Sequence, residues 1–348
     1  MSYSSLPSGV EKTPAREQIV ASVQTVCDRF DDDFWLEKDQ KKEFPFEFHR
    51  AMSESGWLGI TMPVEFGGAG LGVTEAALMM HTVGRSAGAF AACSSIHINL
   101  FGPHAIIKYG TPEQKSKWIP RLITGEDKVA FGVTEPDVGL DTTRIKTRAV
   151  RRGSHYEISG SKVWMSTAQI ANKILLVTRT SPIEDCAKGT DGITLFYVDI
   201  DPKYVEVREI DKMGRAAVDS NLVFIDGLVV SESDRVGEEG GGFRMLLDTL
   251  NPERILIAAE AIGVGRRALD KAVNYANERE VFGRLIGQNQ AIQHPLAESW
   301  MALEAADLMV WRAAGLYDDE EPCGAEANAA KFLAADAAYE ACDRAVRT

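Results

Sequence analysis

The sequence predicts an α+β fold in which two helical domains flank a central antiparallel β-barrel domain. Three observations support this prediction. Apolar residues recur at three- and four-residue spacings from Thr13 to about Gly125, as in helices with one buried face. Short β-branched and aromatic segments fill the region from Lys128 to about Val230. Long helical patterns return from Gly242 onward. We place the three predicted domains at residues 1–127, 128–236 and 237–348.

The first domain is predicted to be all-helical. Its first helix has an apolar face formed by Ile19, Val23, Val26, Cys27 and Phe30. Further helices are expected over residues 46–55, 75–83 and 90–109, with a glycine-rich loop over 63–70. Thr111 is expected to cap the next helix, because Pro112 suits a first helical position.

The central domain is predicted to consist of short strands. They are expected at residues 149–150, 156–158, 173–178, 193–199, 205–207 and 221–225. Turn residues such as Gly153 separate these segments. Their spacing predicts an antiparallel sheet that closes into a small barrel.

The third domain is predicted to be an incomplete, four-helix-bundle-like group of long helices. They are expected to run from Phe243 to about Glu278, from Gln290 to Tyr317 and from Glu326 to Val346. An apolar stripe that includes Ile292, Leu296 and Leu303 marks the buried face of the second helix. Pro295 lies near the start of that helix, where it is tolerated or introduces a kink.

Composition excludes several classes of function. A net charge of −13 over 348 residues argues against nucleic acid as the main partner and against an anionic membrane surface. No apolar run approaches a membrane span, and Met1–Ser8 lacks the features of a signal peptide. Five scattered cysteines indicate a reduced, cytoplasmic setting. The six histidines lack metal-ligand spacing, so no metal site is predicted.

Two segments carry the strongest functional signal: Phe131-Gly-Val-Thr-Glu-Pro-Asp-Val-Gly-Leu-Asp-Thr-Thr143 and Lys162-Val-Trp-Met-Ser-Thr167. In the second segment, Trp164 lies two residues before the hydroxyl of Ser166. A ring-shaped cofactor needs an apolar wall and one hydrogen-bond donor for a ring heteroatom. Either segment alone would indicate only a buried tryptophan or ordinary β-core residues.

Together and in this order, the two segments resemble the flavin-contacting segments of the acyl-CoA dehydrogenase family. The resemblance spans essentially the whole chain. Further motifs that support it are Pro63–Gly70, Gly110–Lys115, Lys212–Gly214, Gly241–Phe243 and Arg279–Gly283 with Gln290. Each motif is weak alone, and the specificity comes from their order and spacing.

The resemblance implies that FAD is the cofactor. The residues implied to border the flavin are Phe131, Val133, Thr134 and Gly139 on one side and Trp164, Met165 and Ser166 on the other. Ser166 would hydrogen-bond the flavin near N5, where hydride arrives. Arg279 and Phe282 resemble the pair that a neighbouring subunit contributes to the FAD pyrophosphate and adenine, and Gln290 would add an adenosine-side contact. A homotetramer or homodimer is therefore expected. Alone, Arg279 would be interpreted as a solvated arginine.

Two features depart from the family pattern. Leu140 stands where the family often has a serine that contacts the thioester substrate, so this contact is expected to be apolar or made by the backbone. The chain also ends at Thr348, before the segment that holds the family's usual catalytic glutamate, and so it looks truncated relative to the family.

Some family members place the catalytic base on a helix of the third domain instead, and the matching position is Glu253. The alternative interpretation is that Glu253 is stabilised by the helix dipole or pairs with Arg254. Arg254 resembles the family position that approaches the CoA end of the ligand. The alternative interpretation of Arg254 is a surface arginine.

The implied function is FAD-dependent α,β-dehydrogenation of an acyl-CoA to the trans-2-enoyl-CoA, with an electron-transfer flavoprotein as the electron-accepting partner. Two alternatives stay open. One is an oxygen-using oxidase of the same fold, acting on acyl-CoA or nitroalkanes. The other is a chain that binds flavin or CoA without turnover, because the usual glutamate segment is missing. Short, medium and branched acyl groups all remain compatible with the sequence.

Overall fold

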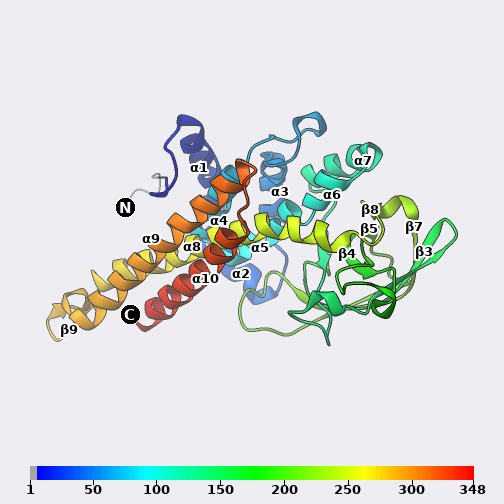
Figure 1. Ribbon diagram of the computed structural model, residues 1–348. Helices are drawn as coiled ribbons and strands as arrows, with labels where there is room; N and C mark the ends of the chain where they lie inside the picture. Colours follow the sequence, from blue (N-terminus) through cyan, green and yellow to red (C-terminus); the bar gives the residue numbers. More distant parts are fainter. Residues whose placement is uncertain (1–5) are drawn as a thin grey trace. The chain divides into compact units, whose positions relative to one another are not determined.

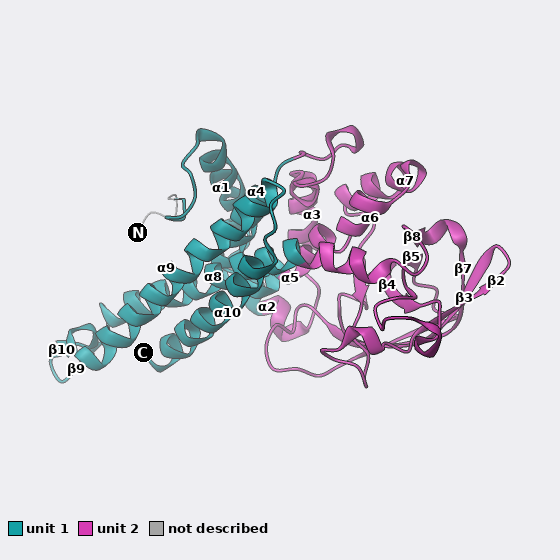
Figure 2. Cartoon of the chain, in the orientation of Figure 1, with its two compact units in different colours: residues 1–36, 71–93, 251–348 teal, residues 37–70, 94–250 magenta. Residues whose placement is uncertain are grey.

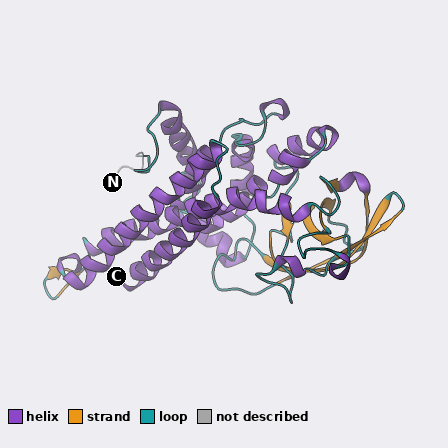
Figure 3. Ribbon diagram, viewed as in Figure 1, coloured by secondary structure: helices purple, strands orange, loops and turns teal. Residues whose placement is uncertain are grey.

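The computed structural model describes residues 6–348 and divides into two compact units (Figure 2). Unit 1 consists of Met1–Leu36, Leu71–Cys93 and Asn251–Thr348, and unit 2 of Glu37–Gly70 and Ser94–Leu250. Residues 1–5, part of the segment in which no signal peptide is expected, lie outside the described residues. Helices account for most of unit 1, whereas unit 2 holds the large sheet (Figure 3).

Unit 1 is a helical bundle. Its elements are α1 (Pro14–Cys27), α4 (Val73–Arg85), α9 (Gln290–Asp318), α10 (Gly324–Arg347) and the hairpin of β9 (Glu280–Val281) and β10 (Arg284–Leu285). Three further helices, α2 (Asp32–Lys41), α5 (Ala89–Phe101) and α8 (Gly242–Ala276), run across the unit boundaries. In unit 1, α8, α9 and α10 are long neighbouring helices, and the β9–β10 hairpin lies at one end of them (Figure 1).

Small residues and one cross-helix cap hold this bundle together. The buried face of α10 is formed by alanines: Ala327, Ala330, Ala334, Ala337, Ala338 and Ala341. Because alanine is small, α10 packs closely against α9, whose buried residues include Leu303 and Val310. The carboxylate of Asp318 in α9 accepts the N–H groups of Val73 and Thr74 at 2.7 and 2.9 Å. It thereby caps the N-terminus of α4.

Unit 2 combines short helices with a sheet. Its helices are α3 (Phe46–Glu54), α6 (His104–Tyr109) and α7 (Pro112–Ile123). The predicted cap of α7 is confirmed. Thr111 Oγ1 accepts the N–H of Gln114 at 3.2 Å, and Gln114 Oε1 accepts the N–H of Thr111 at 2.9 Å. This reciprocal capping box satisfies two backbone donors at the start of the helix.

The stretch predicted as one helix over residues 90–109 is two helices. Gly102 and Pro103 separate α5 from α6, because proline cannot donate the backbone hydrogen bond that would continue α5. By length and composition, Ala89–Tyr109 could cross a membrane, contrary to the expectation that no run approaches that length. However, 78% of its most apolar window is buried inside the protein, which indicates a core segment.

The sheet of unit 2 is open, so the prediction of a closed antiparallel barrel was wrong. Its strands are β1 (Val129–Gly132), β2 (Arg148–Arg152), β3 (His155–Ser166), β4 (Lys173–Arg179), β5 (Ile193–Asp199), β6 (Val205–Glu209), β7 (Ser220–Ser231) and β8 (Arg235–Val236). The strand order is β6-β7-β3-β2-β4-β5-β8, and β1 pairs with β4. Both β1 and β2 run parallel to β4. Because β2 and β4 share only the pair Arg148–Arg179, the sheet is nearly split between them.

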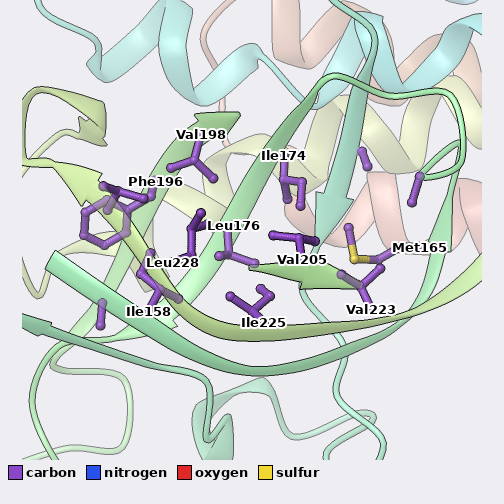
Figure 4. Packing of buried hydrophobic residues seen from close by; sticks show 14 of the residues in the cluster. Ile158, Met165, Ile174, Leu176, Phe196, Val198, Val205, Val223, Ile225 and Leu228 are labelled. Carbon is purple, nitrogen blue, oxygen red and sulfur yellow. The ribbon is translucent and has the colours of Figure 1, made fainter. Parts of the chain in front are cut away.

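One apolar core supports the sheet. Figure 4 shows Ile158, Leu176 and Phe196 pointing inward from different strands, together with Val223 and Ile225 of β7. All five side chains are buried. Alternate residues of a strand point to opposite faces, so these side chains fix which residues of β3 and β7 face outward.

Candidate functional site

The two predicted flavin segments lie side by side in unit 2. The first begins at the end of β1 and continues beyond it, and the second forms the end of β3. The N–H of Val163 donates to the carbonyl of Thr134 at 2.9 Å. The ammonium of Lys162 donates to the carbonyl of Val133 at 3.0 Å. Two segments about thirty residues apart in sequence therefore form one surface.

A buried ion pair between Lys162 and Glu135 connects the two segments of this surface. Lys162 Nζ lies 2.9 Å from Glu135 Oε1, and the two side chains are 0% and 5% exposed. The Glu135 carboxylate also accepts the N–H groups of Lys146 and Thr147 at 2.6 and 2.9 Å. Burial lowers the pKa of Lys162 to about 8, although Glu135 opposes that shift. Burial alone would raise the pKa of Glu135, but Lys162 and the backbone donors lower it.

Trp164 is presented to solvent by a strained stretch of β3. The pairing of β3 with β7 shifts register between Lys162 and Met165, and Trp164 in between has φ of 62°. A non-glycine residue rarely adopts this left-handed conformation, and such strain gathers at functional sites. The indole is 64% exposed. The adjacent Met165 is instead buried in the sheet core, so its side chain is not available to a ligand.

Ser166 lies beside an arginine that sequence reasoning missed. Arg215 Nη2 lies 3.5 Å from Ser166 Oγ and 3.1 Å from Ser220 Oγ. Arg215 also has a left-handed backbone, with φ of 53°, and its carbonyl accepts a hydrogen bond from Lys212 Nζ at 2.8 Å. The motif Lys212–Gly214 directly precedes it and was the available signal. A cation at this position suits an electron-rich or anionic ligand group.

Most of the remaining residues of the first segment are partly or fully exposed. Phe131, Val133 and Thr134 are partly exposed. Leu140 is fully exposed, at 107% of its reference area, and a Cβ placed on Gly139 would meet nothing within 4 Å. Leu140 and Trp164 therefore expose apolar surface on the two segments, and the second segment also carries the hydroxyl of Ser166. These residues fit a planar ring cofactor that needs an apolar wall and a hydrogen-bond donor.

Glu253 and Arg254 lie on α8 in unit 1. Glu253 is partly buried, and its Oε2 atom is shielded from solvent. Arg254 Nη1 donates to Asn251 Oδ1 at 3.1 Å. Arg254 also lines a cavity of about 440 Å³ together with residues of α10, including Lys331 and Tyr339. Arg254 of α8 and the residues of α10 therefore line the same cavity.

Arg279, Phe282 and Gln290 lie far from Glu253 in the same unit. Phe282 and Gly283 form the tip of the β9–β10 hairpin, with φ of 54° and 73°, as a two-residue hairpin turn requires. Phe282 is fully exposed, and Arg279 and Gln290 are exposed as well. The 23 helical steps from Glu253 to Ala276, the last residue of α8, correspond to roughly 35 Å. The hairpin of one copy is therefore far from the Glu253 of that copy.

Among residues 6–348, no group of three or more histidine, cysteine, aspartate or glutamate side chains could hold a metal ion. The five cysteines are free.

Three family models match successive parts of the chain. They describe the N-terminal, middle and C-terminal domains of acyl-CoA dehydrogenases, and they match residues 13–126, 130–228 and 240–348.

Individual proteins show the same likeness. An acyl-CoA dehydrogenase of Bacillus subtilis (strain 168) is 35% identical over 310 residues, which are 89% of this chain and 80% of that protein. A caffeyl-CoA reductase–Etf complex subunit of Acetobacterium woodii is 34% identical over 89% of this chain and 81% of that protein. The solved butyryl-CoA dehydrogenase of Megasphaera elsdenii is 26% identical, with a TM-score of 0.91 over 97% of this chain and 88% of that chain.

Proposed function

Because the chain belongs to the acyl-CoA dehydrogenase family, whose members are FAD-binding oxidoreductases acting on CH–CH groups, we propose that it converts an acyl-CoA to the trans-2-enoyl-CoA. The single observation that carries this proposal is the paired surface of segments 131–143 and 162–167, with exposed Trp164 beside Ser166. We propose short, medium or branched acyl chains as substrates, within cytoplasmic fatty-acid β-oxidation.

Each candidate residue has a proposed task. Glu253 removes a proton from the substrate α-carbon, and a carboxylate shielded from water suits this role. FAD bound at this surface would supply the acceptor for the hydride that leaves the β-carbon. Trp164 provides an apolar wall that helps exclude water, and Ser166 and Arg215 hold the polar edge of the cofactor. Arg254 binds the CoA end of the substrate.

Arg279, Phe282 and Gln290 are proposed to complete the FAD site of a neighbouring copy. A guanidinium binds two oxygens of a diphosphate at once, and a fully exposed phenylalanine at a hairpin tip gains from being covered. A homodimer or homotetramer follows from this assignment. An electron-transfer flavoprotein is the proposed electron acceptor, as the name of the Acetobacterium woodii relative suggests for that protein.

Anaerobic loss of flavin absorbance across a panel of acyl-CoA substrates tests the function. We expect the FAD-loaded protein to bleach rapidly with at least one acyl-CoA. Glu253→Gln should slow bleaching by about 10²–10⁴-fold, the usual contribution of a general base, while leaving FAD bound. Glu278→Gln, an exposed glutamate beyond the end of the same helix, is the matched control and should bleach like the parent protein.

Three outcomes would change the assignment. If no acyl-CoA bleaches the flavin, the chain binds FAD or CoA without turnover. If Glu253→Gln bleaches as fast as the parent protein, Glu253 is not the base. If peroxide accumulates under air without an added acceptor, the protein is an oxidase of the same fold.

A further inference from the structure

An aspartate of α2 holds the loop that carries Arg215. This loop, residues 211–217, lies between β6 and β7 in unit 2. Asp39 Oδ1 accepts the N–H groups of Ala216 and Ala217 at 2.6 and 3.3 Å. Two successive backbone N–H groups that converge on one carboxylate form a concave anion site, and such charge-assisted hydrogen bonds are stronger than neutral ones. The loop is therefore tied to α2 directly after Arg215.

This tie accounts for a backbone conformation that arginine rarely adopts. Arg215 has φ of 53°, and Gly214 before it has φ of 79°. Glycine enters the left-handed region without penalty, whereas arginine does not, and such strain persists only where the surrounding structure fixes it. Asp39 binds the two residues that follow Arg215, and Ala217 is buried at 2% exposure. The chain after Arg215 is therefore fixed, although Met213 is fully exposed.

The guanidinium of Arg215 reaches the end of the β3–β7 pairing. Ser166 and Ser220 lie directly opposite each other there, and Arg215 Nη2 lies within 3.5 Å of both hydroxyl oxygens. Ser166 is the residue proposed to contact the flavin near N5. Uptake of two electrons and one proton makes FAD more negative by one unit, so a nearby cation favours the reduced over the oxidised cofactor.

We propose that Asp39 is a positioning residue for the flavin site. By holding the loop of residues 211–217, Asp39 keeps the guanidinium of Arg215 beside Ser166, where its positive charge raises the reduction potential of bound FAD. This inference rests on the proposed FAD site, but it does not depend on which acyl-CoA is oxidised. It assigns Asp39 no contact with substrate or cofactor.

The reduction potential of FAD in the loaded full chain tests this inference. It is measured anaerobically against a reference dye, without acyl-CoA. We expect Arg215→Gln to weaken the preference for reduced over oxidised FAD by about tenfold, which for a two-electron couple is a potential lower by about 30 mV. Asp39→Ala should lower the potential by at least about 14 mV, or roughly threefold. In the Arg215→Gln background, Asp39→Ala should have no further effect, because Asp39 acts through Arg215.

Asp39→Asn separates the positioning role from the charge of the carboxylate. Its side-chain carbonyl still accepts the two backbone N–H groups, so the potential should stay close to that of the parent protein. Asp33→Ala is the matched control, because it removes the same charge from an exposed residue of the same helix. It should also leave the potential unchanged. The midpoint of urea unfolding is measured for every variant, since a purely structural role of Asp39 lowers this midpoint without moving the potential.

Three results would overturn the inference. They are a potential that Asp39→Ala does not lower, a decrease that is equally large with and without Arg215, and an Asp39→Asn variant that shifts as far as Asp39→Ala. Failure of the proposed function gives a different result. If the dye reduces the bound FAD but no acyl-CoA does, the reaction assignment fails and the role of Asp39 stands. If the parent protein binds no FAD, both fail.

Discussion

At the scale of single residues, the ion pair of Lys162 and Glu135 is the feature that most constrains the candidate flavin surface. Both side chains are buried, so removing one charge leaves the other without its counter-charge in a poorly hydrated site. We expect Lys162→Met to lower the free energy of unfolding by about 3–5 kcal/mol. Urea unfolding at pH 7.5 measures this loss. Lys146→Met removes an exposed lysine from the same region, and should cost no more than about 0.5 kcal/mol.

The pH dependence of that loss tests whether burial or pairing dominates at Lys162. Its folded pKa of about 8 lies below the ordinary lysine value of 10.5. Between these values the unfolded chain binds more protons, so stability from this residue rises with pH. Lys162→Met lacks this contribution. The stability gap between parent and variant should therefore widen from pH 8 to pH 10. A gap that narrows would mean that Glu135 raises the pKa of Lys162 above its unfolded value.

At the scale of elements, the crossing of α4 and α8 in unit 1 depends on glycine. A Cβ on Gly263 would lie 2.3 Å from the carbonyl oxygen of His81, and a Cβ on Gly84 would lie 2.6 Å from that of Glu260. Both obstacles are backbone atoms, which cannot move aside as a side chain can. We expect Gly263→Ala to lower the free energy of unfolding by about 1–3 kcal/mol or more, measured as a lower midpoint of urea unfolding.

Gly315 provides the matched control for this crossing. It lies inside α9, and a Cβ there would meet nothing within 4 Å. Gly315→Ala should therefore stabilise the protein by about 0.5–1 kcal/mol, because alanine favours the helix over the unfolded chain. If the two variants shift the midpoint in the same direction, the close approach of α4 and α8 does not limit stability.

Elements defined by local sequence could be predicted, and those defined by distant pairing could not. The cap at Thr111 depends on residues within one turn, and strand β5 follows directly from its β-branched and aromatic residues. The open sheet was missed because closure depends on whether the edge strands β6 and β8 meet, which no local pattern encodes. Pro103 indicated the break between α5 and α6. The apolar pattern continues on both sides of Pro103, however, and it favoured the prediction of one helix.

At the scale of the whole molecule, the same distinction applies to the candidate site. Trp164 and Ser166 were predicted because they are close in sequence. Arg215 was missed because it reaches Ser166 from 49 residues away, and the Lys162–Glu135 pair was missed because it spans 27 residues. Such contacts are set by the register of packed strands, which a single sequence does not specify.

The largest consequence at this scale concerns assembly. One α8 helix separates Glu253 from the hairpin of Arg279 and Phe282 by roughly 35 Å, so the proposed roles of Glu253 and Arg279 require two copies.

We expect Glu253→Gln and Arg279→Gln to be nearly inactive when each is made alone. In a two-fold assembly of both variants, one of the two sites combines an intact Glu253 with an intact Arg279 from the partner copy. Random pairing at equal amounts makes half of the assemblies mixed, so co-expression should restore about a quarter of the parent activity per protein chain. Flavin bleaching with acyl-CoA measures this recovery, and the same variants purified separately and assayed without exchange serve as the control. If co-expression restores no activity although mixed assemblies form, each hairpin serves its own copy and the shared-site assignment fails.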